Sequence, residues 1–155
     1  MDIRWKRGLL WAAVIATAVL IFSFSAQKGD ASAQISGSLA EQLLIAWWPG
    51  YEILPEPTQL KILNVTDVII RKGGHFVEYA LLGFWVLLLA DSYRVRRRGV
   101  VAWAASSLYA VTDEVHQLLV ADRAGQLRDV CLDSAGALTG VLLAILILKG
   151  RKNYD

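Results

Sequence analysis

Four long apolar stretches constrain this chain more than any other feature of its sequence. They run over residues 8–25, 75–90, 100–120 and 132–148. A helix of about 20 residues crosses the hydrocarbon core of a bilayer, which is about 30 Å thick. One such stretch could be a buried helix of a soluble protein. Four of them in 155 residues predict an all-α membrane protein built as a four-transmembrane-helix bundle in a single domain.

The composition agrees with a membrane protein and excludes other classes. Hydrophobic residues make up 55% of the chain and charged residues 19%, which excludes a disordered protein and disfavours an ordinary soluble domain. The net charge of +2 is too small to indicate nucleic-acid binding. The single cysteine, Cys131, cannot form an intramolecular disulfide and is expected to be a packing residue.

Basic residues predict the orientation of the spans. They flank the first and fourth stretches and fill the short loop between the second and third. These residues are Arg4, Lys6, Arg7, Arg94, Arg96, Arg97, Arg98, Lys149, Arg151 and Lys152. Because short basic segments stay on the cytoplasmic side, both termini are expected in the cytoplasm. A cleavable signal peptide over the first stretch is an alternative, and its removal would leave the other spans in the same orientation.

Residues 26–70 form a long outer segment that is expected to carry short amphipathic helices. Ser38 and Glu41 have the spacing of a capping box, so a helix is expected to begin there and to end at the Pro-Gly pair at 49–50. This helix would lie on the outer leaflet with its tryptophans at headgroup level, or the segment would pack as a loop over the bundle. A second amphipathic stretch starts at Thr58 and leads into the second span.

Ionisable residues within the spans are expected to lie at one depth. At about 1.5 Å per residue, Glu78 lies about 18 Å from the cytoplasmic end of its span, Asp113 about 20 Å and Asp133 about 22 Å. Charged groups inside a membrane are costly, and they are usually paired, hydrated or functional. The agreement between three separately counted helices predicts a polar pocket that opens toward the outer face.

Helical phase places the polar residues of each span on one face. The faces comprise Arg71, His75, Glu78 and Tyr79; Tyr109, Asp113, His116 and Gln117; and Asp129, Asp133, Gly136 and Gly140. The spacing of Gly136 and Gly140 is typical of helices that approach one another closely. Because these glycines share a face with two aspartates, that face is expected to point into the bundle.

Several segments resemble the VanZ-like family of small bacterial membrane proteins. They are SFSAQ at residues 23–27, RKGGHFVEYALLG at 71–83, and residues 113–140, which include DEVHQ and RDVCLDSAGALTG. The resemblance implies a multi-pass protein of the bacterial cytoplasmic membrane. Since the family is named for a protein linked to teicoplanin resistance, it also implies a connection with glycopeptide resistance. Members often have Pro-Gly before the residue corresponding to Arg123, whereas this chain has Ala121 and Asp122, so the loop beside the pocket differs.

One hypothesis for the pocket is an enzyme that acts on anionic lipids or lipid-linked envelope precursors. Imidazole and carboxylate groups together suit a divalent metal ion, which would activate water. The candidate metal ligands are His75, Glu78, Asp113, His116, Asp129 and Asp133. Without a metal, His116 is the candidate general base, oriented by Asp113 or Glu114, and His75 and Glu78 complete the catalytic candidates. No G-x-S-x-G or H-E-x-x-H pattern occurs, which disfavours a serine hydrolase and a thermolysin-type protease.

Candidate substrate-binding residues surround the same pocket. They are Arg71, Lys72, Tyr79, Gln117, Arg123, Arg128, Asp129 and Asp133. The basic members would hold an anionic headgroup or a pyrophosphate, arginine through a bidentate fork.

Three alternatives to an enzyme stay open. The first is a non-catalytic binder of a lipid headgroup or a glycopeptide. The second is a transporter or flippase with a proton relay, which is disfavoured because the first and fourth spans have uncharged cytoplasmic halves. The third is a structural ion-pair network in which the basic residues neutralise the acidic ones.

Overall fold

The computed structural model describes residues 2–27, 29–120 and 125–152, and the chain in these ranges is helical with short connections. The helices are α1 (Ile3–Ser25), α2 (Gly29–Trp47), α3 (Glu56–Ser92), α4 (Arg98–Gln117) and α5 (Leu127–Lys152). The predicted all-α class is therefore confirmed for the described residues. Among these helices, α1, α3 and α5 are long and apolar enough to cross a membrane.

α4 differs from these three helices in composition. Its 20 residues are enough to cross a bilayer, but its last turns carry Asp113, Glu114, His116 and Gln117. These polar residues lower its mean hydropathy, so length and composition do not mark α4 as a span. Length and composition thus support three of the four predicted spans, those in α1, α3 and α5.

α3 is one continuous helix of 37 residues, which makes it about 55 Å long. Pro55 caps it and Pro57 stands in its first turn, where a proline costs no hydrogen bond. The amphipathic stretch from Thr58 and the apolar stretch from residue 75 form one helix, which continues through Gly73 and Gly74. The point at which this helix enters a membrane stays a prediction. Each glycine costs about 1 kcal/mol of helix propensity, and packing against α2 on one side and α1, α4 and α5 on the other outweighs this cost.

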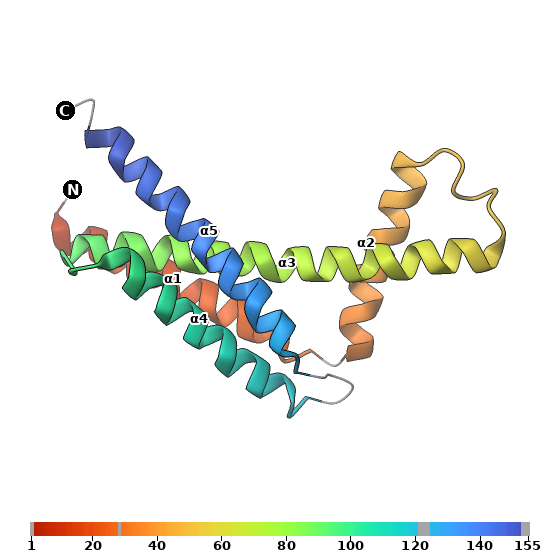
Figure 1. The fold of residues 1–155 in the computed structure, drawn as a ribbon, viewed down its shortest axis with the longest axis horizontal. Helices are drawn as coiled ribbons and strands as arrows, with labels where there is room; N and C mark the ends of the chain where they lie inside the picture. The colour runs from red at the N-terminus through yellow and green to blue at the C-terminus, as the bar shows by residue number, and fades with distance from the viewer. Residues whose placement is uncertain (1, 28, 121–124, 153–155) are drawn as a thin grey trace.

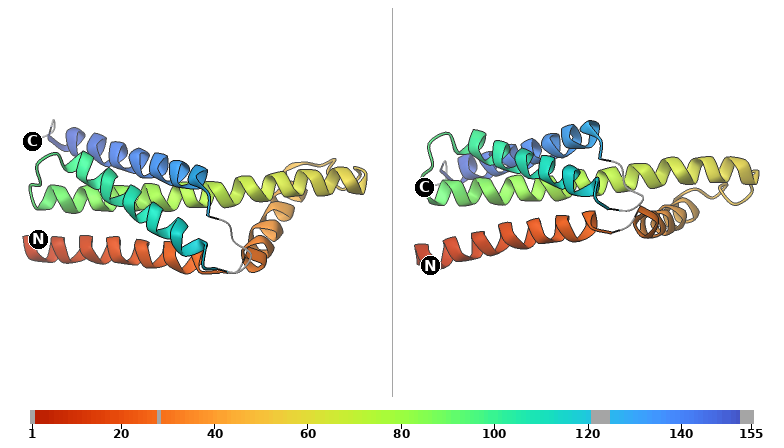
Figure 2. Two further views of the ribbon diagram at one scale, coloured as in Figure 1. Left: turned by 60° about the horizontal axis from the view of Figure 1, so that its bottom comes forward. Right: turned by 90° about the horizontal axis from the view of Figure 1, so that it is seen from below.

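α2 also begins earlier than predicted. Its first residue is Gly29, so Ser38 and Glu41 lie inside the helix and do not form a capping box at its start. Ser36 is buried and its hydroxyl contacts the Asp67 carboxylate of α3. Packing on α3 therefore extends the helix beyond its local start signal. Figures 1 and 2 show α2 lying across α3 at the end of the bundle opposite the termini. Its position on an outer leaflet stays a prediction.

The start of α1 and the end of α5 lie at the same end of the bundle, beside the connection between α3 and α4 (Figure 1). Arg7 of α1 joins these parts, since its guanidinium lies 4.2 Å from the centroid of the Tyr93 ring and donates to the Ser92 carbonyl at 2.8 Å. The segments predicted to be cytoplasmic are therefore neighbours in space.

Apolar side chains fill the bundle in two clusters. The cluster nearer α2 comprises Ile21, Tyr79, Leu82, Ala110 and Ala137. The cluster nearer the termini comprises Leu87, Ala102, Val141 and Ala144. Large apolar side chains also cover the outside of α1 and α5, as expected for helices that face lipid.

α3 and α5 cross at close range through three glycines, Gly83, Gly136 and Gly140, which we call the glycine seam. A Cβ atom on Gly140 would lie 1.7 Å from the Ala80 carbonyl oxygen, and one on Gly136 would lie 2.3 Å from that of Phe76. A Cβ atom on Gly83 would lie 2.3 Å from a carbonyl oxygen of α5. No side chain fits at these separations, so the close approach predicted for Gly136 and Gly140 is confirmed.

Gly140→Ala should lower the thermal unfolding midpoint of the protein purified in detergent, because the added Cβ atom would push α5 away from α3. Overpacking of this kind costs about 1–3 kcal/mol. Gly73→Ala is the matched control, since its Cβ atom would meet nothing within 4 Å and alanine favours a helix. Its midpoint should hold or rise. Equal midpoints for the two variants would show that the seam does not determine the crossing.

Candidate functional site

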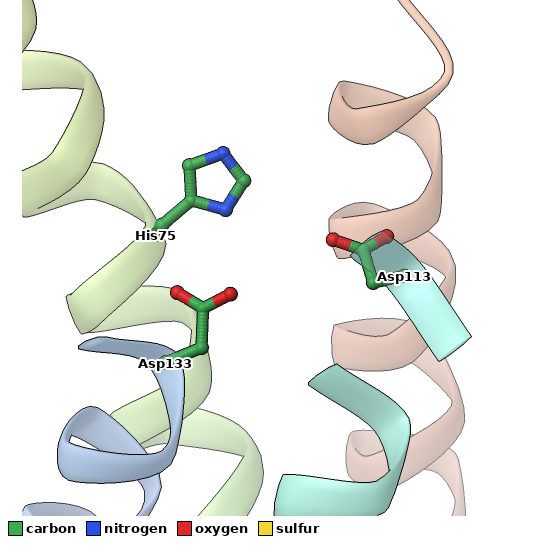
Figure 3. Close-up of side chains that lie close together, drawn as sticks. All are labelled: His75, Asp113 and Asp133. Atoms are coloured by element: carbon green, nitrogen blue, oxygen red, sulfur yellow. The ribbon is translucent and has the colours of Figure 1, made fainter. Parts of the chain in front are cut away.

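Three side chains from three helices meet near the α2 end of the bundle. His75 of α3, Asp113 of α4 and Asp133 of α5 each offer a ligand atom within 4.8 Å of the others (Figure 3). We call these residues the acid–histidine cluster. Asp133 is 0% exposed and Asp113 is 4% exposed. The glycine seam positions two of its members, since Gly136 follows Asp133 by one turn and touches Phe76, the neighbour of His75.

The two buried carboxylates of the cluster have few hydrogen-bond partners. Asp113 accepts a hydrogen bond at Oδ2 from Gln117 Nε2 at 3.3 Å, and its Oδ1 has no partner among the described residues. Neither carboxylate oxygen of Asp133 has a hydrogen-bond partner among the described residues. An uncompensated buried charge costs several kcal/mol. The cluster therefore requires a proton, a cation, a water molecule or a polar ligand.

Glu78 and Tyr79 follow His75 on α3, and both lie near Asp113. Tyr79 is fully buried, its ring centroid is 6.3 Å from that of Tyr109, and its phenol is close enough to Asp113 and Asp133 to interact with them electrostatically. Glu78 is half-buried and close enough to Asp113 and Asp133 to interact with them electrostatically. It lines a cavity of about 300 Å³ between α1, α2 and α3.

A second cavity, of about 360 Å³, lies on the α5 side of the cluster, and we call it the polar cavity. Its wall is formed by Val68, Arg71, Lys72, His75, Glu114, Gln117, Gln126, Asp129, Leu132 and Asp133. The Lys72 ammonium group forms an ion pair with Asp129 from α3 to α5. Arg71 pairs with Asp67, one turn earlier on α3, at 3.1 Å. The polar cavity thus combines two basic side chains with part of the acid–histidine cluster.

Glu114 and His116 occupy other positions at the end of α4. Glu114 is buried, and its Oε2 accepts the backbone N–H of Gln126 at 2.8 Å, just before α5 begins. His116 packs its ring on Phe22 of α1, with ring centroids 4.6 Å apart. In the described residues no hydrogen bond joins His116 to Asp113 or Glu114, so this arrangement does not assemble the expected general-base pair.

The two other predicted basic residues, Arg123 and Arg128, are not placed in the polar cavity by the described part of the structure. Arg123 lies outside the described residues, as do Ala121 and Asp122 of the divergent loop. Arg128 is exposed near the start of α5 and is not among the described residues that line the polar cavity.

The ion-pair network proposed as a structural alternative is seen here only in part. Within the described ranges, Lys72 with Asp129 is the one pair that neutralises a predicted site acid. Arg71 pairs with Asp67, a residue outside the predicted set. The network therefore accounts for Asp129 and leaves Asp113 and Asp133 without a basic partner in the part of the chain that the structure describes.

Two residues of the site were not indicated by the sequence patterns. Asp67 precedes Arg71 by four residues, which is the spacing of an ion pair on one helix face. This signal becomes readable once residues 56–92 are treated as one helix. Gln126 lines the polar cavity because the chain folds back onto Glu114, and no local pattern indicates that contact.

Comparison with known proteins supports the resemblance found in the sequence. The sequence model of the VanZ/LLP1 family matches residues 10–148, which is most of the chain and includes every residue of the site described above. Comparisons with curated proteins and with solved structures gave no match.

Asp133→Asn should raise the thermal unfolding midpoint of chelator-treated protein at neutral pH. The change keeps the side-chain size, removes a buried charge without a partner, and offers amide hydrogens to Asp113. The free energy of unfolding is expected to rise by about 1–3 kcal/mol, because a buried polar group without a partner costs about that much stability. Asp129→Asn is the control on the same helix, and it should hold or lower the midpoint because it breaks the pair with Lys72. A midpoint for Asp133→Asn below that of the wild type would mean that a protein group already satisfies this carboxylate.

Proposed function

Because the chain belongs to the VanZ/LLP1 family of membrane proteins, we propose that its polar cavity binds the anionic headgroup of a membrane lipid or of a lipid-linked cell-envelope molecule. The observation that carries this proposal is the presence of Arg71 and Lys72 in the wall of a cavity of about 360 Å³, next to an otherwise apolar bundle. Cavities of about 300 Å³ or more are large enough for small ligands.

The two basic side chains are positioned for an anionic ligand. Arg71 and Lys72 keep 33% and 43% of their side-chain surface exposed, so a ligand can reach both. Their pairs with Asp67 and Asp129 hold them in place before a ligand arrives, and a phosphate group would compete with these carboxylates. Arginine suits such a ligand because its guanidinium donates two parallel hydrogen bonds.

We also propose that α4 crosses the membrane with α1, α3 and α5, with both termini in the cytoplasm of a bacterial cell. The length of α4 and its packing on α3 and α5 support this proposal. So does the gathering of basic segments at the end of the bundle that carries the termini. The polar cavity then lies at the extracytoplasmic end, where lipid-linked envelope precursors are used. A protein that binds them there would alter their access to a glycopeptide such as teicoplanin.

A hydrolase or transferase acting on a lipid phosphate is the second candidate function. The observation in its favour is that His75 and Asp133 of the acid–histidine cluster lie in the wall of the same cavity. An imidazole or a carboxylate at this place would act as a general base that takes a proton from the water molecule or hydroxyl group attacking a bound phosphate. Release of phosphate from a radiolabelled lipid phosphate by the purified protein would distinguish this candidate from simple binding.

Arg71→Gln and Lys72→Gln should each weaken the binding of phosphatidylglycerol to the purified protein by about tenfold or more. A hydrogen bond to a charged group contributes about 1.5–3 kcal/mol, and about 1.4 kcal/mol corresponds to a tenfold change in affinity. Lipid adducts counted by native mass spectrometry would measure the effect. Arg98→Gln is the control, since Arg98 is also paired with an aspartate but starts α4 at the other end of the bundle. Equal losses in all three variants would refute a specific role for the polar cavity.

The orientation can be tested by cysteine labelling in a Cys131→Ser background, which removes the native thiol. Ser38→Cys in α2 should react with a membrane-impermeant maleimide added to intact cells or spheroplasts, because it lies in the predicted outer segment. Arg96→Cys, between α3 and α4, should react only after the cells are opened. Both positions are exposed, so differences in burial do not confuse the comparison. Labelling of Arg96→Cys alone in intact cells would reverse the proposed orientation.

A further inference from the structure

We infer that His75, Asp113 and Asp133 bind a divalent transition-metal ion of the zinc or manganese type. The inference does not depend on lipid binding, since it rests on side chains that face one another and not on Arg71 or Lys72. The wider set of ligands expected from the sequence is thereby reduced to one residue from each of α3, α4 and α5 (Figure 3).

The donor atoms suit such an ion. One imidazole nitrogen and two carboxylate oxygens are borderline and hard ligands, a combination found at zinc, manganese and iron sites. Magnesium and calcium prefer oxygen ligands alone, so the histidine favours a transition metal. Three protein ligands would also leave a coordination position open for water or a ligand.

The distances require only a small adjustment. In a tetrahedral site with metal–ligand bonds of 2.0–2.2 Å, neighbouring ligand atoms lie about 3.4 Å apart. The ligand atoms of the cluster lie within 4.8 Å of one another. Side-chain rotations that move each ligand atom by about 1 Å would bring these atoms to the distances of a metal site, with the helices held in place.

The burial of the two aspartates is an independent indication of a missing positive charge. Asp133 is 0% exposed, its carboxylate is directed toward the cluster, and neither of its oxygens has a hydrogen-bond partner among the described residues (Figure 3). Asp113 is 4% exposed, and its Oδ1 also has no hydrogen-bond partner among the described residues. As metal ligands, two carboxylates and an imidazole would contribute a charge of −2, which a divalent cation balances.

In the described part of the chain, the basic side chains near the cluster form ion pairs with other acidic residues. Lys72 pairs with Asp129 and Arg71 pairs with Asp67. Glu78 is a further carboxyl group within electrostatic range of both aspartates, and it increases the demand for a cation.

The fold provides a cavity through which the ion can enter and closely packed helices that hold its ligands. His75 and Asp133 line the polar cavity, so an ion can enter through it and its open position would face a bound ligand. The glycine seam holds α3 and α5 backbone to backbone next to these two residues. Rigid helices of this kind hold metal ligands more precisely than loops do.

The test uses full-length protein purified in detergent, stripped with a chelator and titrated separately with Zn²⁺, Mn²⁺, Mg²⁺ and Ca²⁺ in a calorimeter. We expect one Zn²⁺ or Mn²⁺ ion per chain, with weaker binding of Mg²⁺ and Ca²⁺. Binding should also raise the thermal unfolding midpoint, because the ion binds only the folded chain. Asp133→Asn and His75→Gln should each reduce the affinity by about 100-fold or more, the upper range seen when even the supporting residues of a metal site are removed.

Asp129→Asn is the matched control, because Asp129 lies one turn before Asp133 on α5 and already has a partner in Lys72. It should keep the affinity of the wild type, and so should Arg71→Gln, even if the latter loses lipid binding. Circular dichroism and size-exclusion chromatography would verify that the variants stay folded. If they unfold, titration of the wild type alone still decides the question. A wild type that binds no Zn²⁺ or Mn²⁺, that prefers Ca²⁺ or Mg²⁺, or that loses as much affinity in Asp129→Asn as in Asp133→Asn would overturn the inference.

Discussion

α3 and α5 touch backbone to backbone where Gly83, Gly136 and Gly140 leave no side chain between them. Close contact at small residues is how membrane helices gain packing energy, because lipid provides no hydrophobic drive for their association. The seam also sets the register between the two helices, and so determines that Asp133 comes to lie near His75. A larger residue at any of the three positions would separate the helices and with them the two halves of the site.

The seam brings together groups that repel one another. Asp113 and Asp133 are buried with unpaired oxygens in the described part of the chain, while the available cations pair with Asp67 and Asp129 at the rim. Such an arrangement lowers stability, and proteins keep unfavourable polar sites mainly where function requires them. The division between a rim with paired charges and an interior with unpaired carboxylates is what suggests two binding sites, one for an anion and one for a cation.

Much of this arrangement could be predicted because its signals are local. The apolar runs, the basic flanks and the spacing of Gly136 and Gly140 are visible in a few adjacent turns of sequence. Counting along three helices also placed Asp113 and Asp133 at similar depths, and the structure brings both beside His75. The start of α2 and the continuity of α3 could not be predicted, because contacts such as Ser36 with Asp67 join segments far apart in sequence and override local start signals.

The sequence by itself determined that this chain is helical, apolar and charged at defined places, since helix length, hydropathy and charge are properties of neighbouring residues. Only the tertiary structure decided which polar residues meet. It separated His116, packed on Phe22, from the cluster, and assigned Glu114 to the start of α5. The reason is that helical phase limits a side chain to one face of its own helix, whereas the neighbour of that face depends on how closely whole helices cross, which here depends on three glycines.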